Sequence, residues 1–85
     1  METYFIESPH TKEECLAALD GVAAEGEEIL SKFGWGCGSG DHTGYAIVDV
    51  KDETEARLLV PEIVRSKARF TKLNRLTTEQ IEAYH

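Results

Sequence analysis

Apolar and polar positions along the chain first mark three extended segments. Residues 3–8 and 43–50 are rich in β-branched and aromatic side chains, which are typical of strands. Pro9 ends the first run because proline has no N–H to donate to a sheet. Residues 68–76 form a third run of this kind. We therefore predict strands over these three segments.

Apolar residues at helical spacing follow a capping motif after the first strand. Thr11 and Glu14 form a T-x-x-E capping box, in which each side chain can bond an unpaired backbone N–H of the other. The spacing of the apolar residues beyond it predicts a helix over residues 11–33. Gly21 and Gly26 each weaken this helix by about 1 kcal/mol relative to alanine, so we expect a bend or an early end.

Two further capping motifs predict helices in the second half of the chain. Asp52 with Glu55 begins a helix that contains Pro61. An interior proline removes a hydrogen bond and clashes with the preceding turn, so this helix should kink or restart. Thr77 with Gln80 caps a short terminal helix.

The glycine-rich segment GWGCGSGDHTG, between the first helix and the strand over 43–50, allows two interpretations. If it is extended, its alternating glycines share one bare face of a strand, which usually means that backbone, a helix or a ligand approaches closely. Alternatively, the segment is a flexible glycine loop. With a strand on each side, Asp41 and His42 would form the hairpin turn.

The predicted order is β-α-β-β-α-β followed by a helical tail, in one domain over residues 1–85. This is the ferredoxin-like, split βαβ plan of the α+β class, with a four-stranded antiparallel sheet and both main helices on one face. At this level nearly the whole chain resembles small ferredoxin-like proteins of the dimeric α/β-barrel kind, many of them bacterial and uncharacterised. The resemblance brings no catalytic motif to transfer to residues of this sequence.

Size and charge exclude several classes of protein. At this length only about 60% of the extended chain's surface can be buried, so the hydrophobic core is small. A stable fold then needs a well-patterned layer of sheet and helices, a covalent or metal cross-link, or a second subunit. Nine basic and sixteen acidic residues give a net charge of −7. A negative charge opposes sequence-independent binding to the phosphate backbone of nucleic acid. We see neither a run of roughly eighteen apolar residues nor an export signal, and therefore expect no membrane contact and a cytoplasmic, reducing location.

The split βαβ plan gathers polar residues at one edge of the sheet. The end of the first strand, the start of the first helix, the hairpin turn and the start of the last strand should be neighbours there. Both cysteines and two of the three histidines map to this edge, in the set His10, Cys15, Cys37, Asp41, His42, Lys67 and Arg69. The two cysteines are either separate thiols or a pair that is bridged or binds jointly.

Three hypotheses describe this edge. A divalent-metal site would use His42 and His10 with Cys37 or Asp41, because imidazole, thiolate and carboxylate suit zinc or a related ion. In the second hypothesis these residues have only structural roles. Asp41 would stabilise the turn, and the cysteines would be small buried apolar groups. The basic residues would prevent an edge strand from pairing with another chain.

The third hypothesis is a pocket for a small anionic molecule. A run of basic residues without an acidic one begins at this edge. We select its ligand-binding residues as His10, Lys67, Arg69 and Tyr45. We favour a module that binds such a molecule or has a structural role.

The sequence does not decide whether the protein is an enzyme. In a cofactor-free enzyme, His42 would be the acid–base group, oriented by Asp41 or a backbone carbonyl, and Cys37 would be the nucleophile. We find no nucleotide-binding loop and no serine-hydrolase arrangement. We assign no cofactor and no resident metal, and keep the metal-binding protein as an alternative.

A partner is expected from the pattern of the central strands. Both faces of these strands carry apolar residues, but the helices of this plan cover only one, which leaves Phe5, Tyr45 and Ile47 as an exposed patch. A homodimer that packs sheet against sheet would cover the patch. Alternatively, the tail over residues 77–85 folds across it.

Overall fold

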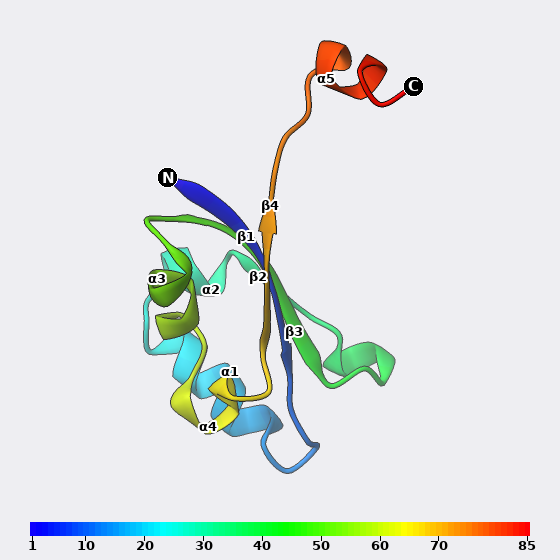
Figure 1. Ribbon diagram of the computed structural model, residues 1–85. Coiled ribbons are helices and arrows are strands. Elements are labelled where there is room, and N and C mark those ends of the chain that lie inside the picture. The colour runs from blue at the N-terminus through cyan, green and yellow to red at the C-terminus, as the bar shows by residue number, and fades with distance from the viewer.

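The computed structural model, which describes residues 1–85, has a four-stranded antiparallel sheet and five α-helices (Figure 1). The α+β class and the antiparallel sheet are therefore confirmed. The strand order is β2-β3-β1-β4, and each neighbouring pair is antiparallel. In chain order the elements are β1 (Glu2–Pro9), α1 (Cys15–Ala23), α2 (Glu27–Leu30), β2 (Phe33–Trp35), β3 (Thr43–Val50), α3 (Glu53–Leu58), α4 (Glu62–Arg65), β4 (Arg69–Leu73) and α5 (Thr78–Glu82).

One face of the sheet carries the core. Ile6 lies opposite Ala46 on one neighbouring strand and opposite Phe70 on the other. Ile6 and Ala46 share the core with residues of α1, α3 and α4, and Figure 1 shows α1 to α4 on one side of the sheet. Successive residues of a strand point to opposite faces, so Phe5 and its partner Ile47 lie on the open face. The buried apolar residues of the core are Tyr4, Ile6, Ala18, Val22, Phe33, Ala46, Val48, Val50, Ala56, Val60 and Val64.

The long helix predicted over residues 11–33 is two short helices. Gly26 has φ +109°, a conformation that L side chains rarely adopt, and it separates α1 from α2. The expected break at a glycine is confirmed. Phe33, predicted as the last helical residue, is the first residue of β2 instead, because it pairs with Ala46 of β3. Tertiary pairing overrides helical spacing at that end.

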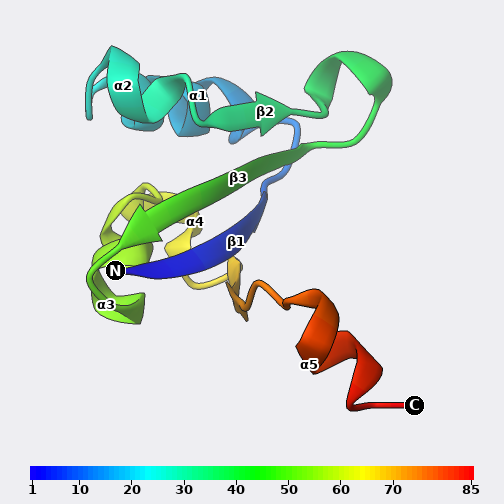
Figure 2. The ribbon, with the colours of Figure 1, turned by 90° about the horizontal axis from the view of Figure 1, so that it is seen from above.

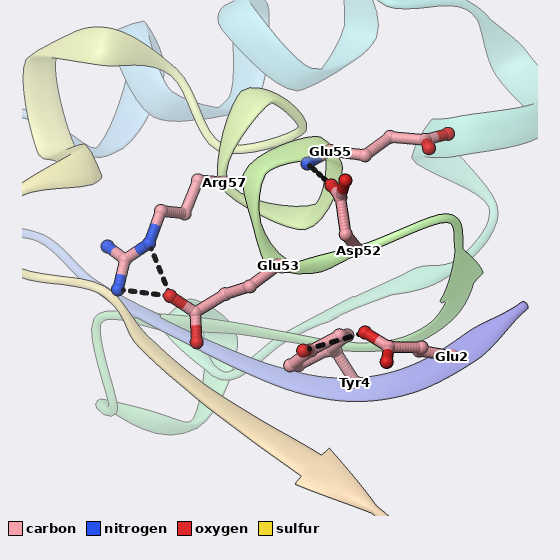
Figure 3. A network of polar contacts seen from close by, with 6 residues as sticks. All are labelled: Glu2, Tyr4, Asp52, Glu53, Glu55 and Arg57. Atoms are coloured by element: carbon pink, nitrogen blue, oxygen red, sulfur yellow. Dashed lines mark hydrogen bonds and ion pairs between the residues drawn. The ribbon is translucent and has the colours of Figure 1, made fainter.

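The capping predictions in the second half are confirmed. The Asp52 carboxylate accepts a hydrogen bond from the backbone N–H of Glu55 and begins α3 (Figure 3). Pro61 divides the predicted helix, since α3 ends at Leu58 and α4 begins directly after the proline. Both bonds of the capping box between Thr77 and Gln80 are present at the start of α5.

The glycine-rich segment is neither a long strand nor an irregular loop. β2 covers only three residues, and a 3₁₀ turn (Cys37–Ser39) follows it. The carbonyl of Gly36 accepts hydrogen bonds from the N–H groups of Ser39 (2.9 Å) and Asp41 (3.0 Å). The connection to β3 is therefore a tight seven-residue turn over 36–42, and the two-residue hairpin at Asp41 and His42 is wrong.

The tail leaves the body of the molecule. The last strand ends at Leu73, short of the predicted residue 76, and α5 projects away along the direction of β4 (Figures 1 and 2). Residues 71–85 are all exposed, so the tail does not cover the open face of its own sheet. None of the helices has the length and apolar character that a membrane crossing requires.

Candidate metal centre

Strand register brings His10 and His42 together. Pro9 at the end of β1 pairs with Thr43 at the start of β3, so the residue after one and the residue before the other are neighbours. The N–H of His10 donates to the carbonyl of His42 at 2.9 Å, which extends the ladder by one bond. The two imidazole rings meet edge to face, with centroids 5.8 Å apart.

The two cysteines reach the same place from two different turns. Cys15 is the first residue of α1, and the reciprocal bonds between Thr11 and Glu14 shape the turn before it. Cys37 begins the 3₁₀ turn after β2. Gly36 keeps that turn tight, since a Cβ there would lie 2.6 Å from the carbonyl oxygen of Asp41.

These four side chains form one cluster. The Sγ atom of Cys37 lies 3.3 Å from Sγ of Cys15 and 3.3 Å from Nε2 of His10. One ligand atom from each of His10, Cys15, Cys37 and His42 lies within 4.8 Å of all the others. A tetrahedral zinc ion with the usual Zn–S and Zn–N bonds needs ligand atoms about 3.3–3.8 Å apart. The two contacts at 3.3 Å match this spacing, and the set as a whole spreads over at most 4.8 Å.

The cluster is sheltered and leaves polar atoms without partners. His10 is 6% exposed, and the other three residues are partly buried. The Nδ1 atoms of His10 and His42 are both buried and make no hydrogen bond. A buried polar atom without a partner is costly, so the protein alone does not satisfy these two imidazoles. The ring of Trp35, 6.3 Å from that of His10, forms one wall.

The surroundings of Cys37 raise the pKa of its thiol and do not activate it. Its interaction with the Cys15 thiol, and after that its burial, raise the pKa of Cys37 above the ordinary thiol value. Reactive cysteines have a depressed pKa, because the thiolate is the reactive form. The hypothesis of a Cys37 nucleophile therefore finds no support in the surroundings of this thiol.

Asp41 lies beside the cluster but makes its hydrogen bonds elsewhere. Its carboxylate accepts from the hydroxyls of Thr43 (2.8 Å) and Tyr45 (2.5 Å). The bond from Tyr45, and after it the bond from Thr43, hold the pKa of Asp41 below its usual range. The bond to Asp41 in turn raises the pKa of the Tyr45 hydroxyl. No hydrogen bond joins Asp41 to His42, so this carboxylate stabilises the turn and does not orient the imidazole.

The predicted anion-binding residues line a neighbouring cavity. It has a volume of about 220 Å³ and is lined by Glu7, Pro9, Thr43, Tyr45, Lys67 and Arg69. Lys67 forms an ion pair with Glu14 and lowers the pKa of that carboxyl to about 2, while Arg69 lies 3.8 Å from Glu7. Both cations thus face acidic partners. His10, which we grouped with them, belongs to the Cys/His cluster instead.

Cys15 is the residue that our metal hypothesis missed. The chain carries two mirrored pairs, H-x₄-C at residues 10–15 and C-x₄-H at residues 37–42. Zinc ligands in proteins commonly come in such closely spaced pairs from two separate segments. This spacing was the available signal for a set of two cysteines and two histidines.

Comparison of the chain with protein-family models, with curated proteins and with solved structures gives no match. The chemistry of the cluster is therefore inferred from its own atoms and from the turns that hold them.

Proposed function

We propose that this protein is a binding module for a zinc-class divalent cation. The ligands would be His10, Cys15, Cys37 and His42. One observation carries the proposal: two sulfur and two nitrogen donors, from two turns far apart in the sequence, lie within 4.8 Å of one another.

The donor set favours zinc or a similar transition metal over the alkaline-earth ions. Imidazole and thiolate suit zinc, whereas magnesium and calcium prefer carboxylate, carbonyl and water oxygen. The four proposed ligands include no oxygen donor. A site closed by four protein ligands is typical of structural zinc, since catalytic zinc keeps one position for water or substrate. We therefore infer a structural role for the metal.

A metal at this position would tie two distant turns together. The turn after β1 supplies His10 and Cys15, and the turn between β2 and β3 supplies Cys37 and His42. Only fourteen residues of the chain are buried, so a metal staple would add much to a thin core. Free thiols are needed as ligands, and both cysteines are free, which agrees with the reducing cytoplasm that we propose as the location.

For the fold, we infer the ferredoxin-like, split βαβ plan. The strand order β2-β3-β1-β4 with antiparallel neighbours supports this assignment, as does the position of α1 to α4 on one side of the sheet in Figure 1. In this plan the Cys/His cluster lies at the end of the sheet where β1 ends and β3 begins.

Metal binding to the reduced protein tests the proposed function. After removal of any metal with a chelator, zinc is titrated against a chromophoric competitor, and Co²⁺ is used as a spectroscopic substitute. We expect one metal per chain and the intense visible and thiolate charge-transfer bands of tetrahedral cobalt. Cys15→Ser, Cys37→Ser and His42→Asn should each weaken binding by at least about 100-fold, since loss of even an outer-shell partner costs 10- to 100-fold.

Two matched variants make the test specific. His85→Asn removes an exposed histidine from the tail and should leave the affinity unchanged. Asp41→Asn separates the proposed set from the alternative in which Asp41 is a ligand, and it should also retain tight binding. Far-UV circular dichroism checks that each variant is folded. Absence of binding in folded wild-type protein, or an octahedral cobalt spectrum without thiolate bands, would reject the proposal.

The neighbouring cavity favours a second candidate function, the binding of a small anion. Tyr45, Lys67 and Arg69 line it, as the anion-binding hypothesis expects. Inorganic phosphate is the simplest probe, and Lys67→Gln with Arg69→Gln should abolish its binding. Glu7 and Glu14 already neutralise these cations, which makes this candidate the weaker one.

A further inference from the structure

The molecule exposes more surface than its mass predicts. Its solvent-accessible surface is 5856 Å², whereas a compact chain of 9.5 kDa exposes about 5,050 Å². Its Cα radius of gyration is 14.6 Å, against about 12 Å for a compact chain of this length. The excess of roughly 800 Å² is what one partner contributes to a standard protein interface.

The open face of the sheet exposes apolar side chains. Ile47, near the centre of the face, is 58% exposed, and the rings of Phe5 and Tyr45 stack beside it with centroids 6.1 Å apart. A cavity of about 340 Å³ lies along these three side chains, with Lys32 at its border. Lys32 makes no ion pair within the chain. The centre of the face is therefore apolar with the unpaired cation Lys32 beside it, while Glu7 and Asp49 lie farther along β1 and β3 on the same face.

The C-terminal arm, residues 74–85, is exposed along its whole length. Its apolar side chains Leu76, Ile81 and Tyr84 are all exposed, and Ile81 retains 46% of its surface. The arm also carries the basic residue Arg75 and the acidic residues Glu79 and Glu82. Its apolar side chains thus match the apolar centre of the open face, and its two acidic residues match Lys32 beside that centre.

The connection between β4 and α5 favours packing of the arm on a second molecule over packing on the sheet of its own chain. Only four residues, 74–77, join the two elements, and none is glycine or proline. Figure 1 shows this connection extended, and both figures show α5 away from the body of the molecule. A short connection that holds an element off its own domain is the arrangement from which exchange between identical chains arises.

We propose that the C-terminal arm of one copy packs on the open sheet face of a second copy, and reciprocally, in a two-fold symmetric homodimer. Ile81 and Tyr84 would lie against Phe5, Tyr45 and Ile47. The acidic residues of α5 would approach Lys32 of the other chain. This dimer does not depend on the metal centre.

Size-exclusion chromatography with light scattering, on the full chain at micromolar concentration, tests the proposal. Wild type should be a dimer, and Ile47→Asp on the face or Ile81→Asp on the arm should each give a monomer. Ile63→Asp is the matched control, because Ile63 is 55% exposed on α4, on the opposite side of the sheet, and this variant should remain a dimer. Trp35 fluorescence and circular dichroism verify the fold of all three.

Mixing the two monomeric variants separates arm exchange from direct packing of one sheet on the other. The Ile47→Asp chain keeps an intact arm, and the Ile81→Asp chain keeps an intact face, so an equimolar mixture should form a mixed dimer with one docked arm. A wild-type monomer, or a dimer that survives Ile81→Asp because the sheets pack directly, overturns the proposal. Failure of the mixture to associate does so as well.

Discussion

Gly21 lies within α1, where glycine costs about 1 kcal/mol relative to alanine. A Cβ at this position would lie 2.6 Å from Cγ and 2.8 Å from Cβ of Pro61. The helix thus approaches the residue before α4 more closely than any side chain at position 21 would allow. The glycine that weakens the helix locally permits this contact between α1 and α4.

Gly21→Ala should therefore destabilise the protein, against the direction that helix propensity predicts. We expect a loss of about 1–3 kcal/mol in the free energy of unfolding, typical of overpacking in a filled site. Urea denaturation followed by Trp35 fluorescence measures it. Gly38→Ala is the control, since a Cβ there meets nothing within 4 Å. The double variant Gly21→Ala with Pro61→Ala should recover part of the loss, and a stabilised Gly21→Ala would contradict the clash.

Glu2 provides a prediction about pH. Its carboxylate accepts from Lys72 Nζ and from the Tyr4 hydroxyl, each at 3.1 Å, and Figure 3 shows the second contact. These bonds, that of Lys72 first, lower the pKa of Glu2 from its ordinary value of 4.5. Because the folded pKa is the lower one, the ionised carboxylate stabilises the fold above pH 4.5, and this contribution is lost as the pH falls through the folded value.

As the pH falls from about 5 to about 3, the free energy of unfolding of the Lys72→Met variant should accordingly decrease less than that of wild type. The difference should be small, because solvent screens exposed ion pairs. Thermal denaturation across this range measures it, with Lys51→Met as the control, a lysine whose side chain makes no ion pair. Parallel pH profiles of wild type and Lys72→Met would show that the pair contributes nothing.

At the scale of elements, the sequence predicted element boundaries best where a strand-forming run or a capping residue acts on the neighbouring backbone. The strand over residues 43–50 has the predicted bounds, and the caps at Asp52 and Thr77 form as their motifs indicate. The helix predicted over 11–33 was wrong at both ends, because α1 begins only at Cys15 and Phe33 pairs with Ala46 across the sheet. Pairing with a distant strand leaves no mark in helical spacing.

The cap of α3 is testable in isolation. Asp52→Ala removes the acceptor of the Glu55 N–H and should cost about 1 kcal/mol of stability. Ala56 and Val60, which follow in this segment, are fully buried, so the loss should appear in global unfolding and not as fraying alone. Thr54→Ala, an exposed position on the same helix, is the control and should change stability by less than about 0.5 kcal/mol.

At the scale of the whole molecule, metal and fold should be coupled. A ligand that binds only the folded state stabilises it by about 2.7 kcal/mol at 100 times its Kd. For a chain of this size that corresponds to a rise in Tm of about 10–20 °C. Differential scanning calorimetry of reduced protein, with and without zinc, measures this shift. The Cys37→Ser variant should show little of it, and an unchanged wild-type Tm would argue against a structural role.

The sequence by itself determined the strand over residues 43–50, the caps at Asp52 and Thr77, the helix breaks at Gly26 and Pro61, and the end of the sheet at which the histidines and cysteines collect. Caps, proline and β-branched runs act over a few residues, and the order of elements leaves few ways to build a sheet. The tertiary structure alone decided how closely Cys15, His10, Cys37 and His42 approach one another, that Asp41 bonds to Tyr45, and that α5 projects from the body of the molecule. These outcomes depend on strand register and on the path of tight turns, because side chains up to 32 positions apart meet only after the sheet has formed.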